Sequence, residues 1–327
     1  MNRTLHLVTG LALVLSGRLA SAEEQLPKDV PPGSVPVAFT IDDLGTTGSE
    51  AVEKTAKALL EAGVPQVYGF LAGSAALDDP DNEESVRVWV RAGYQLGSHT
   101  FSHKELSLVP ADFFEKDILA GEPVLKEFAA PGQDWHWFRY PNLSEGDTLE
   151  KKEAVRAFLL NRPHGDGYRI AQVTVDYADW LFDAAYGRCL KQGRTDRTEW
   201  LKQMYMSKAL YSFVEAQRNA RRLFGRDIPQ IFLVHYSRFT GEVMPELLAG
   251  LKAQGARFIT LEEAQSDPVY DTDSGIILSH GENFLNTRLL ARFPPQEDNA
   301  PARISAWKAK VNETCAEQTQ LVVPGGG

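Results

Sequence analysis

The chain has 327 residues, with 34 Lys+Arg against 44 Asp+Glu, so its formal net charge at pH 7 is −10. This acidity argues against nucleic acid or anionic lipid as a partner and favours a soluble extracytoplasmic enzyme. Hydrophobic residues make up 43% of the chain, which is enough for a packed core. With Cys189 and Cys315 as its two cysteines, the sequence is neither a disulfide scaffold nor a cysteine-based metal cluster. In an oxidising compartment the two cysteines can pair.

The first residues have the pattern of a secretion signal. Met1–Arg3 is a positive start, Leu5–Leu15 is a short apolar run, and Ala20–Ala22 is a small-residue cleavage site. We therefore predict a signal peptide over residues 1–22 and a secreted or periplasmic protein; the alternative is an uncleaved anchor or a buried helix. The apolar run and all later segments are too short for stable membrane insertion. Residues 23–34 are rich in proline and predict an extended linker.

From Val35 onward, apolar segments alternate with helical patterns. Seven segments predict strands: 35–42, 66–73, 94–98, 137–141, 168–175, 230–236 and 257–261. Five segments between them predict helices: 50–62 (with Ser49 as its cap), 84–92, 110–129, 147–160 and 242–253. This alternation is typical of a parallel sheet covered on both faces. It predicts an α/β fold, a distorted (β/α)7-type barrel.

Two regions depart from the alternation. Residues 181–226 carry aromatic and aliphatic residues at helical spacing, which predicts a helical insertion of one or two long helices packed against the core. Residues 271–327 predict a C-terminal extension with two short helices. The catalytic domain is accordingly expected over residues 35–270. A disulfide between Cys189 and Cys315 would tie the extension to the insertion.

The most informative stretch is a pair of histidines, His99 and His103. If the chain turns helical after Gly97, positions four apart lie on one face and both imidazoles can reach a single ion. Zinc is the first choice for such ligands. Two ligands do not make a site, but Asp42-Asp43 supplies carboxylates at the end of an apolar strand. A pair of surface or core histidines is the simpler alternative when these two residues are considered alone.

Polar segments follow five of the predicted strands. In α/β barrels functional residues gather at the carboxyl ends of the strands, so these five segments are expected on one rim. The five segments are Asp42-Asp43, His99 with His103, Arg139-Tyr140-Pro141-Asn142, Asp176-Tyr177-Ala178-Asp179-Trp180 and Leu233-Val234-His235. Together and in this order, over about residues 35–265, they resemble the motifs of the polysaccharide deacetylases of carbohydrate esterase family 4.

The resemblance implies a role for each motif residue. Asp43, His99 and His103 would hold Zn2+, or another divalent metal such as Co2+. Asp42 would be the general base and His235 the general acid. Arg139 would orient Asp42, and Asp179 would support the arrangement through Arg139 or His235. The substrate would contact Leu233 (at the acetyl methyl group), Tyr140, Asn142 and Trp180, with a backbone N–H near 140–142 at the oxyanion.

Two residues differ from the family pattern. Ile41 replaces an aromatic residue on the buried side of a strand, where the change is tolerated. Asn142 replaces the usual tyrosine, so the chemistry carries over more directly than the shape of the sugar pocket. Of the remaining histidines, His136, His164 and His280 are expected in loops or on the surface.

The predicted function is an exported, metal-dependent deacetylase that removes N- or O-acetyl groups from a saccharide. Its partner would be an acetylated saccharide such as chitin oligomers, peptidoglycan or xylan. The alternatives are an amidohydrolase acting on a non-sugar acylated amine and an inactive sugar-binding protein on the same scaffold. The insertion starts directly after Trp180 and leads back to the strand of His235. We therefore expect it to form a wall along one side of the substrate groove and to favour short oligomers.

Overall fold

The computed structural model describes residues 34–161, 167–294 and 305–316. The predicted signal peptide over residues 1–22 lies outside these ranges, as does the predicted linker apart from Ser34. In the described part of the chain, none of the helices has the length and apolar character that crossing a bilayer requires.

Strand β1 (Val35–Leu44) pairs with three neighbours, β2, β6 and β7, in a parallel sheet. Its early residues pair with β7, its later residues pair with β2, and β6 runs along most of its length. From β2 the sheet continues through β3 and β4 to β5. The remaining strands are β2 (Val67–Leu71), β3 (Gln95–Ser98), β4 (Trp137–Phe138), β5 (Arg169–Ile170), β6 (Gln230–His235) and β7 (Ala256–Ile259). All these pairings are parallel, so the carboxyl ends of the strands share one rim.

The chain after β5 brings the two edges of this sheet together. The N–H of Ala171 donates to a carbonyl of β4 (2.7 Å), and the N–H of Leu233 in β6 donates to the carbonyl of Val175 (3.0 Å). One short segment therefore bonds to β4 at its start and to β6 at its end. This confirms the distorted (β/α)7-type barrel. Only Arg169–Ile170 of the strand predicted over 168–175 is regular, and Val175 adds an isolated bridge.

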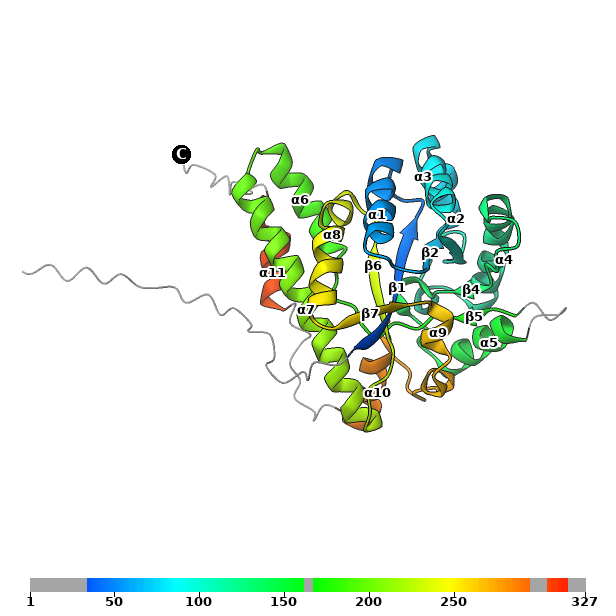
Figure 1. Cartoon of the computed structure of the whole chain (residues 1–327). Helices are drawn as coiled ribbons and strands as arrows, with labels where there is room; N and C mark the ends of the chain where they lie inside the picture. The colour runs from blue at the N-terminus through cyan, green and yellow to red at the C-terminus, as the bar shows by residue number, and fades with distance from the viewer. Residues whose placement is uncertain (1–33, 162–166, 295–304, 317–327) are drawn as a thin grey trace, which may run out of the picture.

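Helices cover the outside of the sheet (Figure 1). Helix α1 packs against α8, and α6 and α7 form a further layer against α8, with α11 against α6. The α-helices are α1 (Ser49–Glu61), α2 (Gly73–Asp78), α3 (Pro80–Arg91), α4 (Ala111–Phe128), α5 (Leu149–Leu160), α6 (Leu181–Lys191), α7 (Thr195–Phe224), α8 (Arg238–Ala253), α9 (Leu261–Gln265), α10 (Phe284–Arg292) and α11 (Ala306–Glu313). Short 3-10 turns are η1 (Leu106–Leu108), η2 (Pro141–Leu143) and η3 (Pro268–Asp271).

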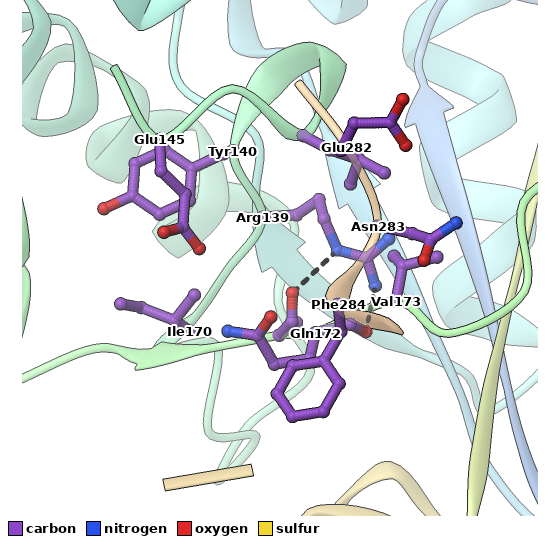
Figure 2. Close-up of a pocket in the computed structure, with 11 residues that line it drawn as sticks. Arg139, Tyr140, Glu145, Ile170, Gln172, Val173, Glu282, Asn283 and Phe284 are labelled. Carbon is purple, nitrogen blue, oxygen red and sulfur yellow. Dashed lines mark hydrogen bonds between the residues drawn. The ribbon is translucent and has the colours of Figure 1, made fainter. Parts of the chain in front are cut away.

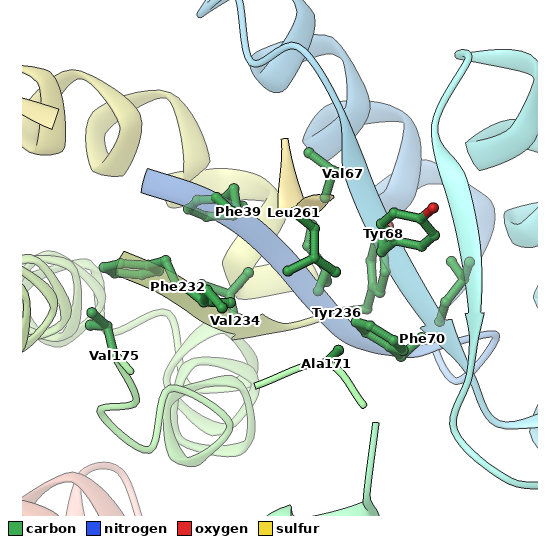
Figure 3. Close-up of a cluster of buried hydrophobic side chains, with 14 of the residues drawn as sticks. Phe39, Val67, Tyr68, Phe70, Ala171, Val175, Phe232, Val234, Tyr236 and Leu261 are labelled. Atoms are coloured by element: carbon green, nitrogen blue, oxygen red, sulfur yellow. The ribbon is translucent and has the colours of Figure 1, made fainter. Parts of the chain in front are cut away.

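Large apolar side chains are buried on both faces of the sheet (Figure 3). Phe39 of β1 and Phe232 of β6 stack with ring centroids 5.4 Å apart, and both are buried. Tyr68 and Phe70 from β2 are likewise buried, but on the opposite face, inside the barrel, where the Arg139 guanidinium lies over the ring of Phe70. Burial of such rings is the main stabilising term of the fold, at roughly 1.5–3 kcal/mol for each large side chain. The core keeps the strand ends, and thus the rim, in fixed positions.

The insertion and the extension meet through a disulfide. Cys189 in α6 is bonded to Cys315, which follows α11, with Cα atoms 5.2 Å apart. Arg188 adds hydrogen bonds to the carbonyls of Asn312 (2.7 Å) and Thr314 (3.1 Å). The pairing of the two cysteines, which the sequence only allowed, is therefore present. The insertion, predicted as one or two long helices, is helical: it consists of α6, with 11 residues, and α7, with 30.

Some predicted element boundaries were wrong for local reasons. The cap of α1 is Gly48; Ser49 is already helical, and its hydroxyl donates to Asp81 Oδ1 (2.6 Å). Helix α3 begins at Pro80, before the predicted residue 84, because Asp79 caps it. Helices α2 and α9, of six and five residues, were not predicted. Segments this short carry too little periodicity to be recognised.

Candidate active site

Asp42 and Asp43 stand where β1 ends. In a regular strand adjacent side chains point to opposite faces, so two neighbouring carboxylates would not share one pocket. Asp43, however, has a left-handed backbone (φ 63°), and this breaks the alternation. As a result both carboxylates line the same pocket. Asp42 is almost completely buried, and its backbone pairs with His235 of β6.

His99 and His103 follow β3 in a tight turn. The helical conformation considered after Gly97 is not formed. Thr100 (φ 65°) and His103 (φ 53°) are left-handed, and the N–H of His103 donates to Thr100 Oγ1 (3.0 Å). The carboxylate of Asp117 in α4 accepts the N–H of Ser102 (3.1 Å to Oδ2). These hydrogen bonds give the backbone N–H groups of Ser102 and His103 side-chain acceptors in place of helical carbonyls. The turn brings the two Nε2 atoms to 3.2 Å from each other.

The side chains of Asp43, His99 and His103 fit a divalent metal. Their ligand atoms lie within 4.8 Å of one another. Asp43 Oδ1 is 3.1 Å from His103 Nε2 and 3.7 Å from His99 Nε2. His99 Nδ1 lies 2.8 Å from the carbonyl oxygen of Arg139, which only accepts, so Nδ1 carries the proton and the Nε2 lone pair faces the other ligands. One carboxylate and two imidazoles are a donor set that zinc accepts.

Protonation in this cluster follows from burial and from the close pairs. Burial lowers the pKa of His99 to about 4, which keeps the imidazole neutral as a ligand must be. Burial would lower the pKa of His103 as well, but the hydrogen bond to Asp43 outweighs it and the pKa is raised. For Asp43 burial acts to raise the pKa, yet the His103 hydrogen bond and the nearby imidazoles lower it overall. The carboxylate therefore stays ionised.

Asp42 is held by a fully buried arginine. Arg139 Nη1 lies 3.3 Å from each carboxylate oxygen of Asp42, and Nη2 donates to Thr40 Oγ1 (3.1 Å). The Nε–H donates to the carbonyl of Ala171 (3.0 Å), and the guanidinium lies over the ring of Phe70 (4.6 Å to the centroid). Burial lowers the pKa of Arg139 from its ordinary value, but such a group remains charged. The guanidinium fixes the orientation of Asp42 from behind the pocket.

His235 is held by Asp179. Of the two partners predicted for Asp179, Arg139 and His235, it is His235 that the carboxylate contacts. His235 Nδ1 lies 2.7 Å from Asp179 Oδ1, and the backbone N–H of His235 donates to Oδ2 (2.7 Å). Burial would lower the pKa of His235, but the charge and hydrogen bond of Asp179 outweigh it and raise the pKa to about 10. His235 is therefore protonated at neutral pH, and it lines the pocket.

The predicted residues do not all reach the pocket, whose volume is about 520 Å³. Leu233, Asn142 and Trp180 line it, and Trp180 is 58% exposed at its rim. Tyr140 is buried instead, with its ring 5.0 Å from that of Phe138, so its side chain is not brought to the pocket. Arg139 and Asp179 likewise act from behind the lining residues.

Sequence reasoning assigned no role to several lining residues, although Asp176 belongs to a segment expected on the rim. Glu105 accepts the side-chain N–H of Asn142 (3.4 Å), and Asp176, whose pKa is raised by burial, also faces the pocket. His280 and Gly281 come from the C-terminal extension. His280 is exposed as predicted, but its place at the site depends on how the extension docks. No local sequence pattern encodes that.

The insertion does not form the expected wall. Among the described residues that line the pocket, Trp180 is the last one before α6, and none belongs to α6 or α7. These helices pack on α8, on the outside of the barrel. The two ends of the insertion start from the rim, as expected, but its helices turn away from it.

Backbone strain in the described residues is concentrated on this rim. Left-handed backbone is unfavourable for residues other than glycine, at roughly 1–3 kcal/mol each, and such residues cluster at functional sites. Apart from Cys315, every non-glycine residue with positive φ in the described ranges lies in a rim turn: Asp43, Thr100, His103, Asn142, Leu143 and Ala178. Asn142 tolerates this conformation better than most residues.

Part of the chain matches a known protein-family model. Residues 29–157 match the family model of polysaccharide deacetylases. The match covers the segments that hold Asp42-Asp43, His99 with His103, and Arg139 to Asn142. It confirms the family resemblance there. Among curated proteins, no sequence matches the chain.

Three solved structures illustrate the similarity in chain trace. One is a carbohydrate esterase family 4 pseudoenzyme from Bacillus anthracis (20% identity, TM-score 0.48, 72% of this chain and 66% of that chain). A second is a variant of the peptidoglycan deacetylase PdaC from Bacillus subtilis (17%, 0.45, 74% and 96%). A third is a family 4 carbohydrate esterase from Streptomyces lividans in complex with acetate (18%, 0.45, 70% and 95%). At these identities and TM-scores, the similarity does not bear on activity.

Proposed function

We propose, from the premise that residues 29–157 match the polysaccharide deacetylase family, that this protein is an exported, metal-dependent deacetylase acting on an acetylated saccharide. The observation that carries the proposal is the meeting of three groups in one pocket. They are the candidate ligands Asp43, His99 and His103, the buried Asp42 with Arg139, and the protonated His235 with Asp179.

The metal would be held by Asp43, His99 and His103, with Zn2+ as the first choice and Co2+ as a substitute. Asp43 is the better ligand of the two carboxylates because it is 3.1 Å from His103 Nε2. Asp42 Oδ2 comes no nearer than 3.8 Å to His99 Nε2. A bound divalent ion supplies Lewis-acid polarisation of the acyl group and lowers the pKa of water at the site. Three protein ligands leave positions open for water and substrate.

Asp42 would act as the general base. Its carboxylate is bound by Arg139 rather than placed in the ligand cluster, so its oxygens remain available to a proton. It would accept a proton from the water that attacks the acyl carbon. The Arg139 guanidinium, in turn fixed by Thr40 and Ala171, keeps the carboxylate correctly oriented.

His235 would act as the general acid. Asp179 accepts the Nδ1–H and stabilises the imidazolium, so Nε2–H is the group left to protonate the departing nitrogen or oxygen. Leu233 would contact the acetyl methyl group, and Trp180 and Asn142 the sugar. A backbone N–H in residues 140–142 would stabilise the oxyanion. Tyr140 itself would contribute through its backbone, because its side chain is buried.

The proposed location outside the cytoplasm rests on two observations. Residues 1–22 have the pattern of a signal peptide. The Cys189–Cys315 disulfide fits an oxidising compartment.

A second candidate function is supported by Asn142. The family pattern has a tyrosine at this position, so the part of the pocket that shapes a sugar differs while the catalytic groups are kept. An amidohydrolase acting on a non-sugar acylated amine would need the same base, acid and metal.

Acetate release tests the proposal. The purified protein is stripped with a chelator, reloaded with Zn2+ or Co2+, and assayed on acetylated chitooligosaccharides, peptidoglycan, acetylxylan and simple N-acetylated amines. We expect release from a saccharide only in the reloaded protein, with Asp42→Asn as the inactive control. Release from the simple amines alone would favour the amidohydrolase, and metal-independent release would contradict the proposed mechanism.

A further inference from the structure

The C-terminal extension supplies part of the substrate pocket. We propose that residues 272–283, which we name the strap, form a fixed wall that limits how far a saccharide extends across the site. This inference rests on the proposed function, because it concerns the same pocket. It assigns the predicted preference for short oligomers to the strap, in place of the helical insertion.

The wall is in direct backbone contact with the rim. A Cβ atom on Gly281 would lie 1.8 Å from the carbonyl oxygen of Asn142 and 2.6 Å from the carbonyl carbon of Leu143. Only glycine allows two backbones to approach so closely. Gly281 and the neighbouring His280 line the pocket together with Asn142 and Leu143. The strap and the turn after β4 therefore form one continuous surface.

The first end of the strap is anchored on α5. Lys152, whose side chain is only 8% exposed, lies 2.8 Å from Asp273 Oδ1 and 3.1 Å from Glu145 Oε2. Its ammonium group also reaches the carbonyl of Ile276 (3.5 Å). A buried lysine is stable only with such partners, and removing one of them leaves an uncompensated charge. The strap is thus tied to the segment that follows the Asn142 turn.

The second end is anchored on the barrel and on α10. The N–H of Phe284 donates to the carbonyl of Val173 (2.7 Å), within the segment that closes the barrel. Asn283 caps α10 by accepting the N–H of Asn286 (3.0 Å). The Phe284 ring packs against Tyr270, with ring centroids 4.8 Å apart. Figure 2 shows Glu282, Asn283 and Phe284 lining a small second pocket together with Arg139.

An element anchored at both ends behaves as a wall rather than as a lid. It fills the part of the rim between the turn after β4 and the segment at Val173. A sugar chain that enters the pocket cannot continue across this part, so added sugar units on that side make no contact with the site. His280, with a side chain that is 67% exposed, is the strap residue at the mouth.

A chain-length series tests the wall. The specificity constant kcat/KM for acetate release is measured on acetylated chitooligosaccharides from dimer to hexamer, with the zinc-loaded protein. The variants are Gly281→Ala, which pushes the strap off the Asn142 turn, and His280→Ala, which removes the side chain at the mouth. Gly187→Ala is the matched control, because a Cβ there meets nothing within 4 Å.

We expect the wild-type protein and Gly187→Ala to gain nothing from longer substrates. Both strap variants are expected to raise the ratio of hexamer to dimer kcat/KM by about tenfold, the size of effect that a changed pocket contact has on specificity. If Gly281→Ala does not fold, the test rests on His280→Ala. This variant removes an exposed side chain and is therefore expected to fold. An unchanged ratio in an active His280→Ala protein would overturn the wall and leave the proposed function intact. Absence of acetate release from every saccharide by the zinc-loaded wild type would instead remove both.

Discussion

Two sides of the pocket are built by different means. On one side Asp42, Asp43 and His235 stand at the carboxyl ends of parallel strands and His99 directly follows one, so the sheet places them. On the other side His280 and Gly281 belong to the strap, which pairs with no strand of the barrel. The strap is held by the ion pairs of Lys152 and by backbone contact.

This difference separates the chemistry of the site from its shape. Groups placed by strand ends are fixed by the core and recur wherever the same short motifs follow the same strands. The shape of the pocket depends on a segment that lies more than a hundred residues beyond the family-model match at residues 29–157. Variants on the two sides are therefore expected to fail differently: the first should lose chemistry, and the second should change substrate selection.

The largest effect is expected for the metal ligands. His103→Ala should lose stoichiometric metal and nearly all activity together, because two remaining ligands hold zinc weakly. The fold should persist, since the barrel core lies elsewhere. Elemental analysis and far-UV circular dichroism measure the two properties, with His136→Ala as a control histidine outside the pocket. Full metal occupancy in His103→Ala would contradict the ligand assignment.

The next effect separates the base from the ligand. Asp42→Asn should retain the metal yet lose about 10²–10⁴-fold in kcat, the usual contribution of a general base. Asp43→Asn, its neighbour, should lose the metal instead. Metal content and kcat of the two variants are compared at one pH. If Asp42→Asn emptied the site, the roles of the two aspartates would have to be exchanged.

Much of the side of the pocket that is built from strand ends could be predicted, because short stretches of sequence specify it. An apolar run that ends in Asp42-Asp43 specifies a buried strand and a carboxylate at its end, and the strand–helix alternation specifies the parallel sheet. Tertiary geometry changed the details. His99 and His103 meet through left-handed turn residues rather than on a helix, because Asp117 of α4 bonds the turn.

The second side could not be predicted, for a physical reason. Gly281 matters because the backbone of Asn142 lies against it, and a contact between residues so far apart leaves no periodic pattern. The insertion was wrongly predicted to line the pocket. Its ends start at the rim, but its apolar stripe packs α6 and α7 onto α8. Attachment points fix where a segment begins, whereas its buried face fixes where it goes.

A smaller effect on chemistry is expected when the support of the acid is removed. In Asp179→Asn the carboxylate that raises the pKa of His235 to about 10 is gone, so that pKa should fall. An acid works only while protonated, and the alkaline limb of the pH–rate profile should therefore move to lower pH. We expect a loss of roughly 10–100-fold near neutrality, as for other residues that orient a functional imidazole. Asp147→Asn, which breaks an ion pair with the partly exposed Lys151, is the control, and an unmoved alkaline limb would argue against His235 as the acid.

The smallest effect on activity is expected for the disulfide, which lies on neither side of the pocket. Cys189 and Cys315 are separated by 126 residues, and closing such a loop stabilises a protein by about 5 kcal/mol on the chain-entropy model. The double variant Cys189→Ala, Cys315→Ala should unfold at lower urea concentration. The loss should stay below that figure, because Arg188 and Gln192 still bond the backbone at the end of α11. Metal content and kcat at a temperature where the variant is folded should match the wild type, since neither α6 nor α11 lines the pocket. Urea titration and acetate release on the same preparation measure both properties, and a parallel fall in kcat would mean that the outer helices do position the rim.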